Sequence, residues 1–204
     1  MKKLITLLSF FGFCCTAQAA LITSSFTGNF NDDNSRYYIQ FDVTADNTQV
    51  NLISFSYAGG VNAAGTSIAD GGFDPQLFVF DSANNLLQSD DDSSNVISAS
   101  SGNSWDALIN ISLNIGTYFA VLTQYNSDYQ SGDLVTGIWS DANTTNFVDV
   151  DNNVRSSFFA FDISGENLAN VGGIGHNVTT VPEPSSLALL GLALLGLGAR
   201  RKFS

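Results

Sequence analysis

The sequence predicts an all-β fold, an antiparallel β-sandwich, and three observations support this prediction. Apolar residues in the central part of the chain alternate with polar ones at a period of two. Helical periodicity does not extend over a useful length there, and clusters of Gly, Asn and Ser separate the apolar segments. About six to nine short strands with polar outer faces are typical of two antiparallel sheets that enclose one core.

The expected strands can be placed one by one from this alternation. The clearest are 37–44 and 107–114, because every second residue of each is apolar. The alternation changes phase between Leu52 and Ile53, which indicates a bulge or the end of a strand. The other expected strands are 53–58, 77–80, 118–125 and 157–163. Two Phe-rich stretches are apolar on both faces and are expected in central strands, namely 78–80 and 158–161.

The N-terminal segment, 1–19, is typical of a secretory signal peptide. Its parts are the basic residues Lys2 and Lys3, the apolar run 4–15 and the A-x-A cleavage site 17–19. The exported chain is therefore expected to begin at Ala20. Acylation of Cys14 or Cys15, as in a lipoprotein, is an alternative, but a bulkier residue would then precede the cleaved bond, where small residues are preferred.

Cysteine usage and charge limit what the exported part can do. Both cysteines lie in the signal peptide, so the exported part of the chain has no disulfide, thiol nucleophile or thiolate ligand. Between residues 20 and 180 only Arg36 and Arg155 are basic, against 18 acidic residues, which leaves a net charge of −16. We therefore exclude nucleic acid and anionic membrane surfaces as partners. Divalent cations are favoured partners, unless the charge serves only to keep an exported protein soluble.

The C-terminal segment, 181–204, combines three features. It starts with Val181, Pro182, Glu183 and Pro184, continues with the apolar run 187–199 and then has the basic cluster 200–202. A helix over the apolar run would be roughly 20 Å long, which is shorter than the ~30 Å hydrocarbon core of a bilayer. The basic cluster places the C-terminal end of such a transmembrane helix in the cytoplasm and the rest of the chain on the other side.

This order of features resembles the PEP-CTERM sorting signal of Gram-negative bacteria that make exopolysaccharide, and the resemblance covers the whole segment. It implies that a membrane enzyme, the exosortase, recognises the Pro-Glu-Pro motif at 182–184 and that the tail is processed. The short helix would then be a transient anchor in the inner membrane, before the protein reaches the cell surface or the extracellular matrix. An ordinary single-pass anchor without processing is the alternative.

A second resemblance concerns the strands. The run Gly-Gly-Phe-Asp-Pro-Gln-Leu-Phe-Val-Phe-Asp at 71–81, followed by three Asp at 90–92, is similar to a hairpin of bacterial pre-peptidase C-terminal type domains. The resemblance extends over about residues 26–163 and implies a jelly-roll-like β-sandwich with no established catalytic role. We therefore expect the domain at 20–166 and a linker at 167–180.

The residue types and motifs in the sequence argue against the common catalytic sites. The only histidine, His176, lies in the expected Gly-rich linker, away from the rigid scaffold that a Ser-His-Asp site needs. No nucleophile elbow, P-loop or zinc motif occurs in the sequence. We expect no enzymatic activity, although a glycosidase pair of carboxylates has no linear signature, so an unrecognised glycan hydrolase stays open.

Calcium is the sharpest binding hypothesis. Three adjacent carboxylates repel one another unless a cation or full solvation relieves them, and Ca²⁺ accepts about six to eight oxygen ligands with tolerant geometry. The candidate ligands are Asp90, Asp91, Asp92 and Asp81. Asp74 flanks the same hairpin, and solvated turns are the alternative. A second acidic run, 149–153, begins like an EF-hand but lacks the Gly and Glu of that motif, which is therefore rejected.

Aromatic residues near loops suggest a glycan site, because sugar rings stack on exposed aromatic faces. The candidates are Trp105, Trp139, Tyr125 and Tyr129. Burial in the core is the commoner fate of such side chains. Taken together, the sequence predicts a secreted, non-enzymatic protein of the cell surface or extracellular matrix, with a structural or adhesive role in exopolysaccharide, biofilm or floc. A carbohydrate-binding module is the main alternative.

Overall fold

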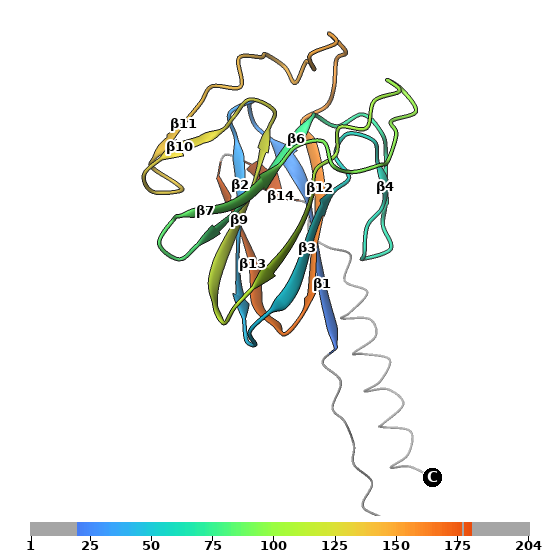
Figure 1. Cartoon of the computed structure of the whole chain (residues 1–204). Coiled ribbons are helices and arrows are strands. Elements are labelled where there is room, and N and C mark those ends of the chain that lie inside the picture. The colour runs from blue at the N-terminus through green and yellow to red at the C-terminus, as the bar shows by residue number, and fades with distance from the viewer. Residues whose placement is uncertain (1–19, 177, 181–204) are drawn as a thin grey trace, which may run out of the picture.

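The structure, a computed structural model, describes residues 20–176 and 178–180 (Figure 1). All the regular structure in these residues is β-strand, arranged in antiparallel sheets, which confirms the predicted all-β class. Nowhere in these two ranges is there a helix long and apolar enough to cross a membrane. The predicted signal peptide and the hydrophobic run near the C-terminus lie outside the described residues.

The first sheet has five strands in the order β14-β1-β12-β3-β8. Their bounds are Val178–Thr180 for β14, Leu21–Phe30 for β1, Phe158–Glu166 for β12, Thr48–Ser54 for β3 and Leu108–Leu113 for β8. The central strand is β12, which forms nine residue pairs with β1 and five with β3. The prediction that the Phe-rich segment 158–161 is central is therefore confirmed.

The second sheet also has five strands, in the order β13-β2-β9-β6-β7. Their bounds are Leu168–His176 for β13, Arg36–Val43 for β2, Gly116–Gln124 for β9, Pro75–Asp81 for β6 and Leu86–Asp90 for β7. The other Phe-rich segment, 78–80, lies in β6 between two neighbouring strands, as the sequence predicts.

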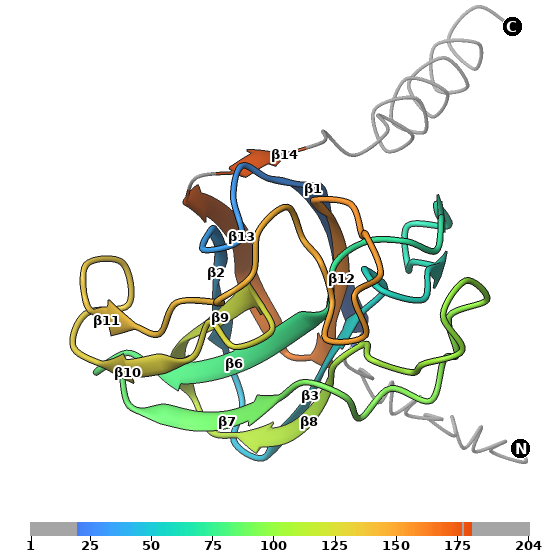
Figure 2. The same ribbon diagram turned by 90° about the horizontal axis from the view of Figure 1, so that it is seen from above.

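One hydrophobic core receives side chains from both sheets. Figure 2 shows the strands of the two sheets from above. The side chains that β2 contributes are the alternate ones the sequence places on one face, Tyr37, Ile39, Phe41 and Val43. The ring of Tyr37 lies 4.9 Å from that of Phe159 and 5.9 Å from that of Phe161, between centroids. Aromatic pairs at such distances add about 0.5–1.5 kcal/mol each to the free energy gained by burial.

A second, smaller cluster covers the outer face of the second sheet. The hairpin of β10 (Tyr129–Ser131) and β11 (Ile138–Trp139) lies there. Trp139 contacts Phe78 edge-on at 5.5 Å between ring centroids, and Tyr129 contacts Phe80 at 4.8 Å. This cover explains why β6 is apolar on both faces. The remaining strands, β4 (Gly60–Val61) and β5 (Ser67–Ile68), form a hairpin in a loop.

Two segments differ from the sequence prediction. In the expected linker 167–180, residues 168–176 form β13, which pairs with β2, and residues 178–180 form β14, which pairs with the end of β1. Their Gly-rich composition conceals them, because backbone pairing needs no apolar side chains. The strand expected at 53–58 is also wrong: β3 ends at Ser54, and the phase change after Leu52 marks its last residues.

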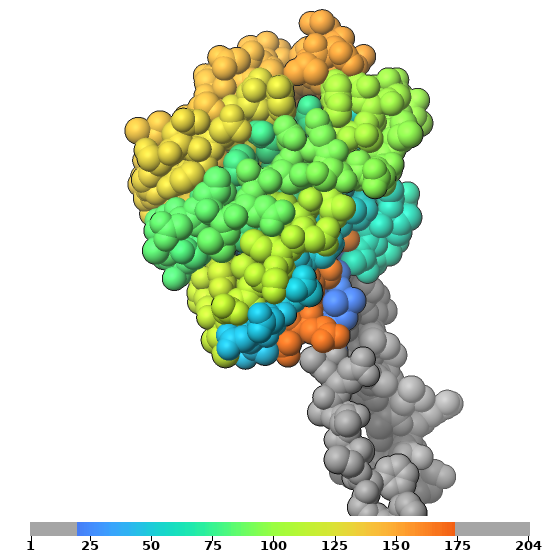
Figure 3. All heavy atoms as spheres, viewed as in Figure 1, coloured from blue at the N-terminus to red at the C-terminus, as the bar shows by residue number. Residues whose placement is uncertain are grey.

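The long connections gather at one end of the molecule, which we call the loop end. It consists of residues 31–35, 55–74, 91–107 and 125–157. Segments 91–107 and 125–157 form the upper part of the molecule in Figures 1 and 3, whereas the β4–β5 hairpin within 55–74 lies at its side, against the first sheet. Short turns, such as 44–47 and 114–115, close the opposite end. Because loops tolerate polar and functional residues better than strands do, the loop end is where we expect a site.

Candidate functional site

Most of the buried charge of the described residues lies at the loop end. Asp74, Asp106, Asp149 and Arg155 are buried there, while Asp162 is buried within β12. A buried charge is costly unless it has partners. The partners of each side chain therefore distinguish the residues that close the fold from those left free to bind something else.

Arg155 is a structural residue that connects three loop segments. Its Nε donates to the carbonyl oxygen of Gly72 at 2.9 Å, and its Nη2 donates to the carbonyl oxygen of Tyr57 at 2.5 Å. Nη1 donates to Ser100 Oγ at 3.0 Å, and Nη2 forms an ion pair with Asp70 at 3.3 Å. Burial acts to raise the pKa of Asp70, but its hydrogen bonds and the Arg155 charge outweigh burial and lower that pKa.

Two further carboxylates at the loop end are fully engaged by the fold. Asp106 accepts hydrogen bonds from Ser54 Oγ and from the backbone N–H groups of Tyr57 and Ala58, at 2.7 to 3.1 Å. Asp149 closes its own turn by accepting from two backbone N–H groups, the Asn153 amide and the Tyr57 hydroxyl. Both therefore hold loops in place, which also explains the acidic run 149–153 without a metal.

The structure does not bring the four calcium candidates together. Asp90 accepts hydrogen bonds from Ser93 and from the backbone N–H of Leu108, so it ties β7 to β8. Asp81 closes the turn between β6 and β7 by accepting from Ala83 and Asn85. In the β6–β7 register Asp90 pairs with Leu77, four residues before Asp81. Asp81 therefore lies at the other end of the hairpin, roughly 13 Å away at 3.3 Å per residue.

Asp74, and not Asp81, lies near the acidic run 90–92 in the structure. Its side chain is 6% exposed, and no donor among the described residues reaches its Oδ1. Burial raises the pKa of Asp74 to about 8, and the negative charges of Asp92 and Asp91 add to the rise. Desolvation, followed by repulsion from Asp91 and Asp90, raises the pKa of Asp92 to about 6.

Metal coordination is not preformed in the described ranges. No three His, Cys, Asp or Glu side chains converge there closely enough to hold a metal ion. Calcium binding by Asp90, Asp91 and Asp92 therefore stays a prediction that solution measurements must decide. Asp90 already has donors, which leaves Asp91 and Asp92 as the available carboxylates of the run.

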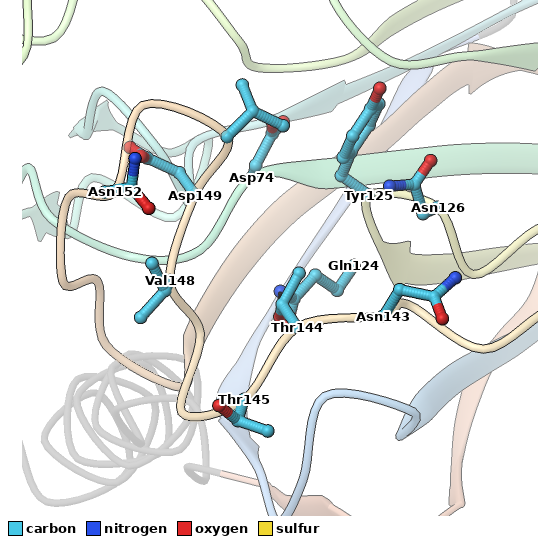
Figure 4. A pocket seen from close by; sticks show the side chains of 11 residues that line it. Asp74, Gln124, Tyr125, Asn126, Asn143, Thr144, Thr145, Val148, Asp149 and Asn152 are labelled. Carbon is cyan, nitrogen blue, oxygen red and sulfur yellow. Dashed lines mark hydrogen bonds between the residues drawn. The ribbon is translucent and has the colours of Figure 1, made fainter.

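A polar cavity of about 500 Å³ opens at the loop end, between the end of β9 and the 143–152 loop (Figure 4). Its walls carry amide, hydroxyl and carboxyl groups together with one aromatic ring. The lining residues are Asp74, Gln124, Tyr125, Asn126, Asn143, Thr144, Thr145, Val148, Asp149, Val150 and Asn152. A second cavity of about 500 Å³ lies at the opposite end of the domain and includes Gln49 and Asn110.

The four aromatic candidates do not form one binding platform. Trp139 and Tyr129 pack against each other at 5.2 Å between ring centroids, within the small outer cluster. Trp105 packs on Tyr57 at 5.1 Å, close to the Arg155 contacts. Tyr125 alone of the four lines the polar cavity. All four side chains are half-buried, and only Tyr125 lies in the cavity lining.

Gln124 is a site residue that the sequence interpretation missed. It continues the inward row of β9, after Ala120 and Leu122, yet it is polar and only 2% exposed. A polar residue in phase with a core-facing row is a signal that the sequence does contain. Apolar alternation alone does not single out Gln124, because the strand predicted at 118–125 is apolar at most of its other positions.

Comparison with known proteins concerns the C-terminal tail. The PEP-CTERM protein-sorting motif matches residues 180–202. This motif indicates an exported protein that is sorted to the cell envelope and processed by an exosortase. Among curated proteins, none matches the chain. The match begins at residue 180, where the described β-domain ends, so it assigns a route of export and not the activity of the domain.

Proposed function

We propose that this chain is a non-enzymatic protein of the cell surface or extracellular matrix, with a structural or adhesive role in exopolysaccharide. The sorting motif at 180–202 is the observation that carries the proposal. The domain would be a jelly-roll-like β-sandwich related to pre-peptidase C-terminal type domains. Two five-stranded antiparallel sheets around one core support that assignment.

The hydrogen bonds of three carboxyl groups at the loop end support a non-enzymatic role, whereas Asp74, which lines the cavity, has an unpartnered oxygen. Asp106 and Asp149 accept bonds from the loops they close, and Asp70 is paired with Arg155. A general acid or base needs a carboxyl group that can reach a substrate. These three carboxyl groups are instead committed to the fold. A carbohydrate-binding module is the second candidate, and the polar cavity is the observation that favours it.

The proposed function is tested by matrix retention in a bacterium that carries an exosortase and makes exopolysaccharide. The full chain should be recovered with the exopolysaccharide fraction, and its deletion should weaken cell aggregation. The control is an unrelated soluble domain placed between residues 1–19 and 181–204 of this chain. That fusion should be sorted in the same way but should wash out of the matrix. Equal retention of the two proteins would remove the adhesive role from the domain.

A further inference from the structure

The polar cavity at the loop end contains two buried side-chain oxygen atoms that the fold leaves without a hydrogen-bond partner. They are Oδ1 of Asp74 and Oε1 of Gln124, and neither has a hydrogen-bond partner among the described residues. Both side chains line the cavity and are more than nine-tenths buried. Native structures satisfy the large majority of such atoms, so each one points to a missing partner. The second cavity, at the opposite end, has no such atom in its lining.

The orientation of the Gln124 amide is fixed by its neighbours. Thr144 donates its hydroxyl proton to Asp33 at 2.6 Å, so its oxygen is free to accept. The Nε2 group of Gln124 donates to that oxygen at 2.8 Å. Because a hydroxyl carries only one proton, Thr144 cannot donate to Gln124 at the same time. Oε1 of Gln124 is therefore held as an acceptor, and its missing partner must be a donor.

The charge around the cavity limits what that donor can be. Asp149 lies in the lining, and Asp91 and Asp92 are close enough to act on the pKa of Asp74. Neither Arg36 nor Arg155, the basic residues of the described part, lines the cavity. An anionic ligand would be repelled. Hydroxyl groups supply donors without charge, and a sugar ring presents several of them beside an apolar face.

The third feature is an aromatic side chain at the mouth of the cavity. Figure 4 shows Tyr125 beside Asn126, across from the 143–152 loop. Tyr125 follows Gln124 directly, and its backbone N–H donates to the carbonyl oxygen of Asp74 at 2.8 Å. The Tyr125 ring, Gln124 and Asp74 are thereby held in one place. A flat ring next to hydroxyl acceptors is the combination that a sugar needs, because its apolar face stacks while its hydroxyl groups donate.

We propose that this cavity binds a segment of a glycan that carries no acidic groups, with Gln124 accepting a hydrogen bond from one of its hydroxyl groups, the Asp74 carboxyl group hydrogen-bonding to another and Tyr125 stacking on a sugar ring. The inference rests on the proposed function, which places the protein in contact with exopolysaccharide. It adds the binding site and the charge class of the glycan. Neither Trp105 nor Trp139 lines this cavity.

Titration calorimetry on the full chain tests this site. The protein is purified in a detergent without a sugar head group, since a glycosidic detergent would compete for the cavity. The probes are a neutral glucan oligosaccharide, a glucosamine oligosaccharide and a guluronate oligosaccharide of equal length. We expect saturable binding of at least one of the first two and at least tenfold weaker binding of the guluronate probe.

Two variants locate the binding in the cavity. Gln124→Ala removes an acceptor and Tyr125→Ala removes the ring, and each should weaken binding about tenfold, as the loss of one polar or one stacking contact does. The control is Gln49→Ala in the second cavity, which should bind like the wild-type chain. Near-ultraviolet circular dichroism verifies that all variants are folded. Because Tyr125 is only partly buried, its variant remains informative if Gln124→Ala fails to fold.

Each result either supports or overturns the inference. No saturable binding by the folded wild-type chain, or equal affinity for guluronate, overturns it. Unchanged affinity in Tyr125→Ala and in a folded Gln124→Ala also overturns it. Matrix retention is measured separately with the same variants. Retention without binding in the cavity would leave the adhesive function intact and refute only the site, whereas loss of retention in the sorted wild-type chain would refute the function itself.

Discussion

The guanidinium carbon of Arg155 lies 3.8 Å from the centroid of the Tyr57 ring. The same guanidinium group donates to the backbone oxygens of Gly72 and Tyr57 and pairs with Asp70. Arg155 is 7% exposed, so these contacts are shielded from water. They join loop segments that the two sheets do not connect by strand pairing.

Replacing Arg155 is therefore expected to destabilise the domain. Arg155→Ala removes the cation that pairs with Asp70, which keeps only its Ser98 and Ser100 donors, and takes the guanidinium donors away from the carbonyl oxygens of Gly72 and Tyr57. It should lower the free energy of unfolding by about 3–5 kcal/mol. Arg155→Lys keeps the charge but not the planar fork, and should lose a large part of the same free energy. Chemical denaturation measures both. The control is Arg36→Ala, because Arg36 is more exposed and contacts Trp139 at a longer distance, 5.2 Å. Equal losses at both positions would contradict the role of Arg155.

Asp74 is expected to make stability depend on pH. Its pKa is about 8 in the folded protein, well above the ordinary range, because burial disfavours the charged form. Between about pH 4 and pH 8 the folded state binds a proton that the unfolded state releases, so stability falls as pH rises. The cost is at most about 1.4 kcal/mol for each pH unit in that window. Asp74→Asn should flatten this slope and raise the melting temperature at pH 8.

Asp106→Asn is the matched comparison for Asp74→Asn. Burial also raises the pKa of Asp106, but its oxygens accept from three donors. An amide would turn an N–H group toward one of those donors and should destabilise the fold. Thermal unfolding of the two variants is measured between pH 4 and pH 8. At pH 8 the melting temperature should rise in Asp74→Asn and fall in Asp106→Asn, relative to the wild-type chain. A steeper slope in Asp74→Asn would contradict the assignment.

The sorting motif predicts the fate of the tail. Replacing Pro182, Glu183 and Pro184 by alanine removes the recognition signal but keeps the apolar run, so the chain should stay associated with the membrane. Cell fractionation and immunoblotting measure the distribution. The control is a set of alanine substitutions of equal size in the exposed turn 82–85, which should not change sorting. Unchanged release of the Pro-Glu-Pro variant would disprove recognition at this motif.

Calcium binding at the acidic run predicts a thermal shift. A cation bound only by the folded state stabilises it by about 2.7 kcal/mol when free ion is 100 times the dissociation constant. For a domain of this size the melting temperature should rise by roughly 5–10 °C. Sodium at matched ionic strength should have much less effect. Calorimetry with chelator and then with millimolar Ca²⁺ measures the shift, and the Asp91→Asn, Asp92→Asn double variant should abolish it. Equal melting temperatures in the wild-type chain would leave these residues as solvated turn residues.

The sequence predicted the fold wherever side-chain alternation decides it. The inward row of β2 was correct because a half-buried strand must separate apolar from polar residues. By contrast, β13 was missed because Gly172 and Gly173 pair with β2 through the backbone alone, and the partner strand lies far away along the chain. The pattern of side chains cannot reveal such a pairing.

The candidate site was predicted less well, for a different reason. Asp81 and Asp74 are equally plausible neighbours of the acidic run in sequence, and only the hairpin register separates them. Likewise, nothing next to Arg155 in sequence indicates that its partners are Gly72 and Tyr57, because they are brought together by loops. Contacts between distant loops have no linear pattern to detect.

The last described strand has a mechanical consequence. β14 is held to β1 by three residue pairs at the edge of its sheet, whereas β1 is held to β12 by nine. A force applied to the tail therefore acts first on the shorter pairing. Opening it would lengthen the chain by about 10 Å, at 3.4 Å per residue, while the central strands and the core stay in place. The domain thus has a short extensible element immediately before Val181, which can yield under shear before the fold does.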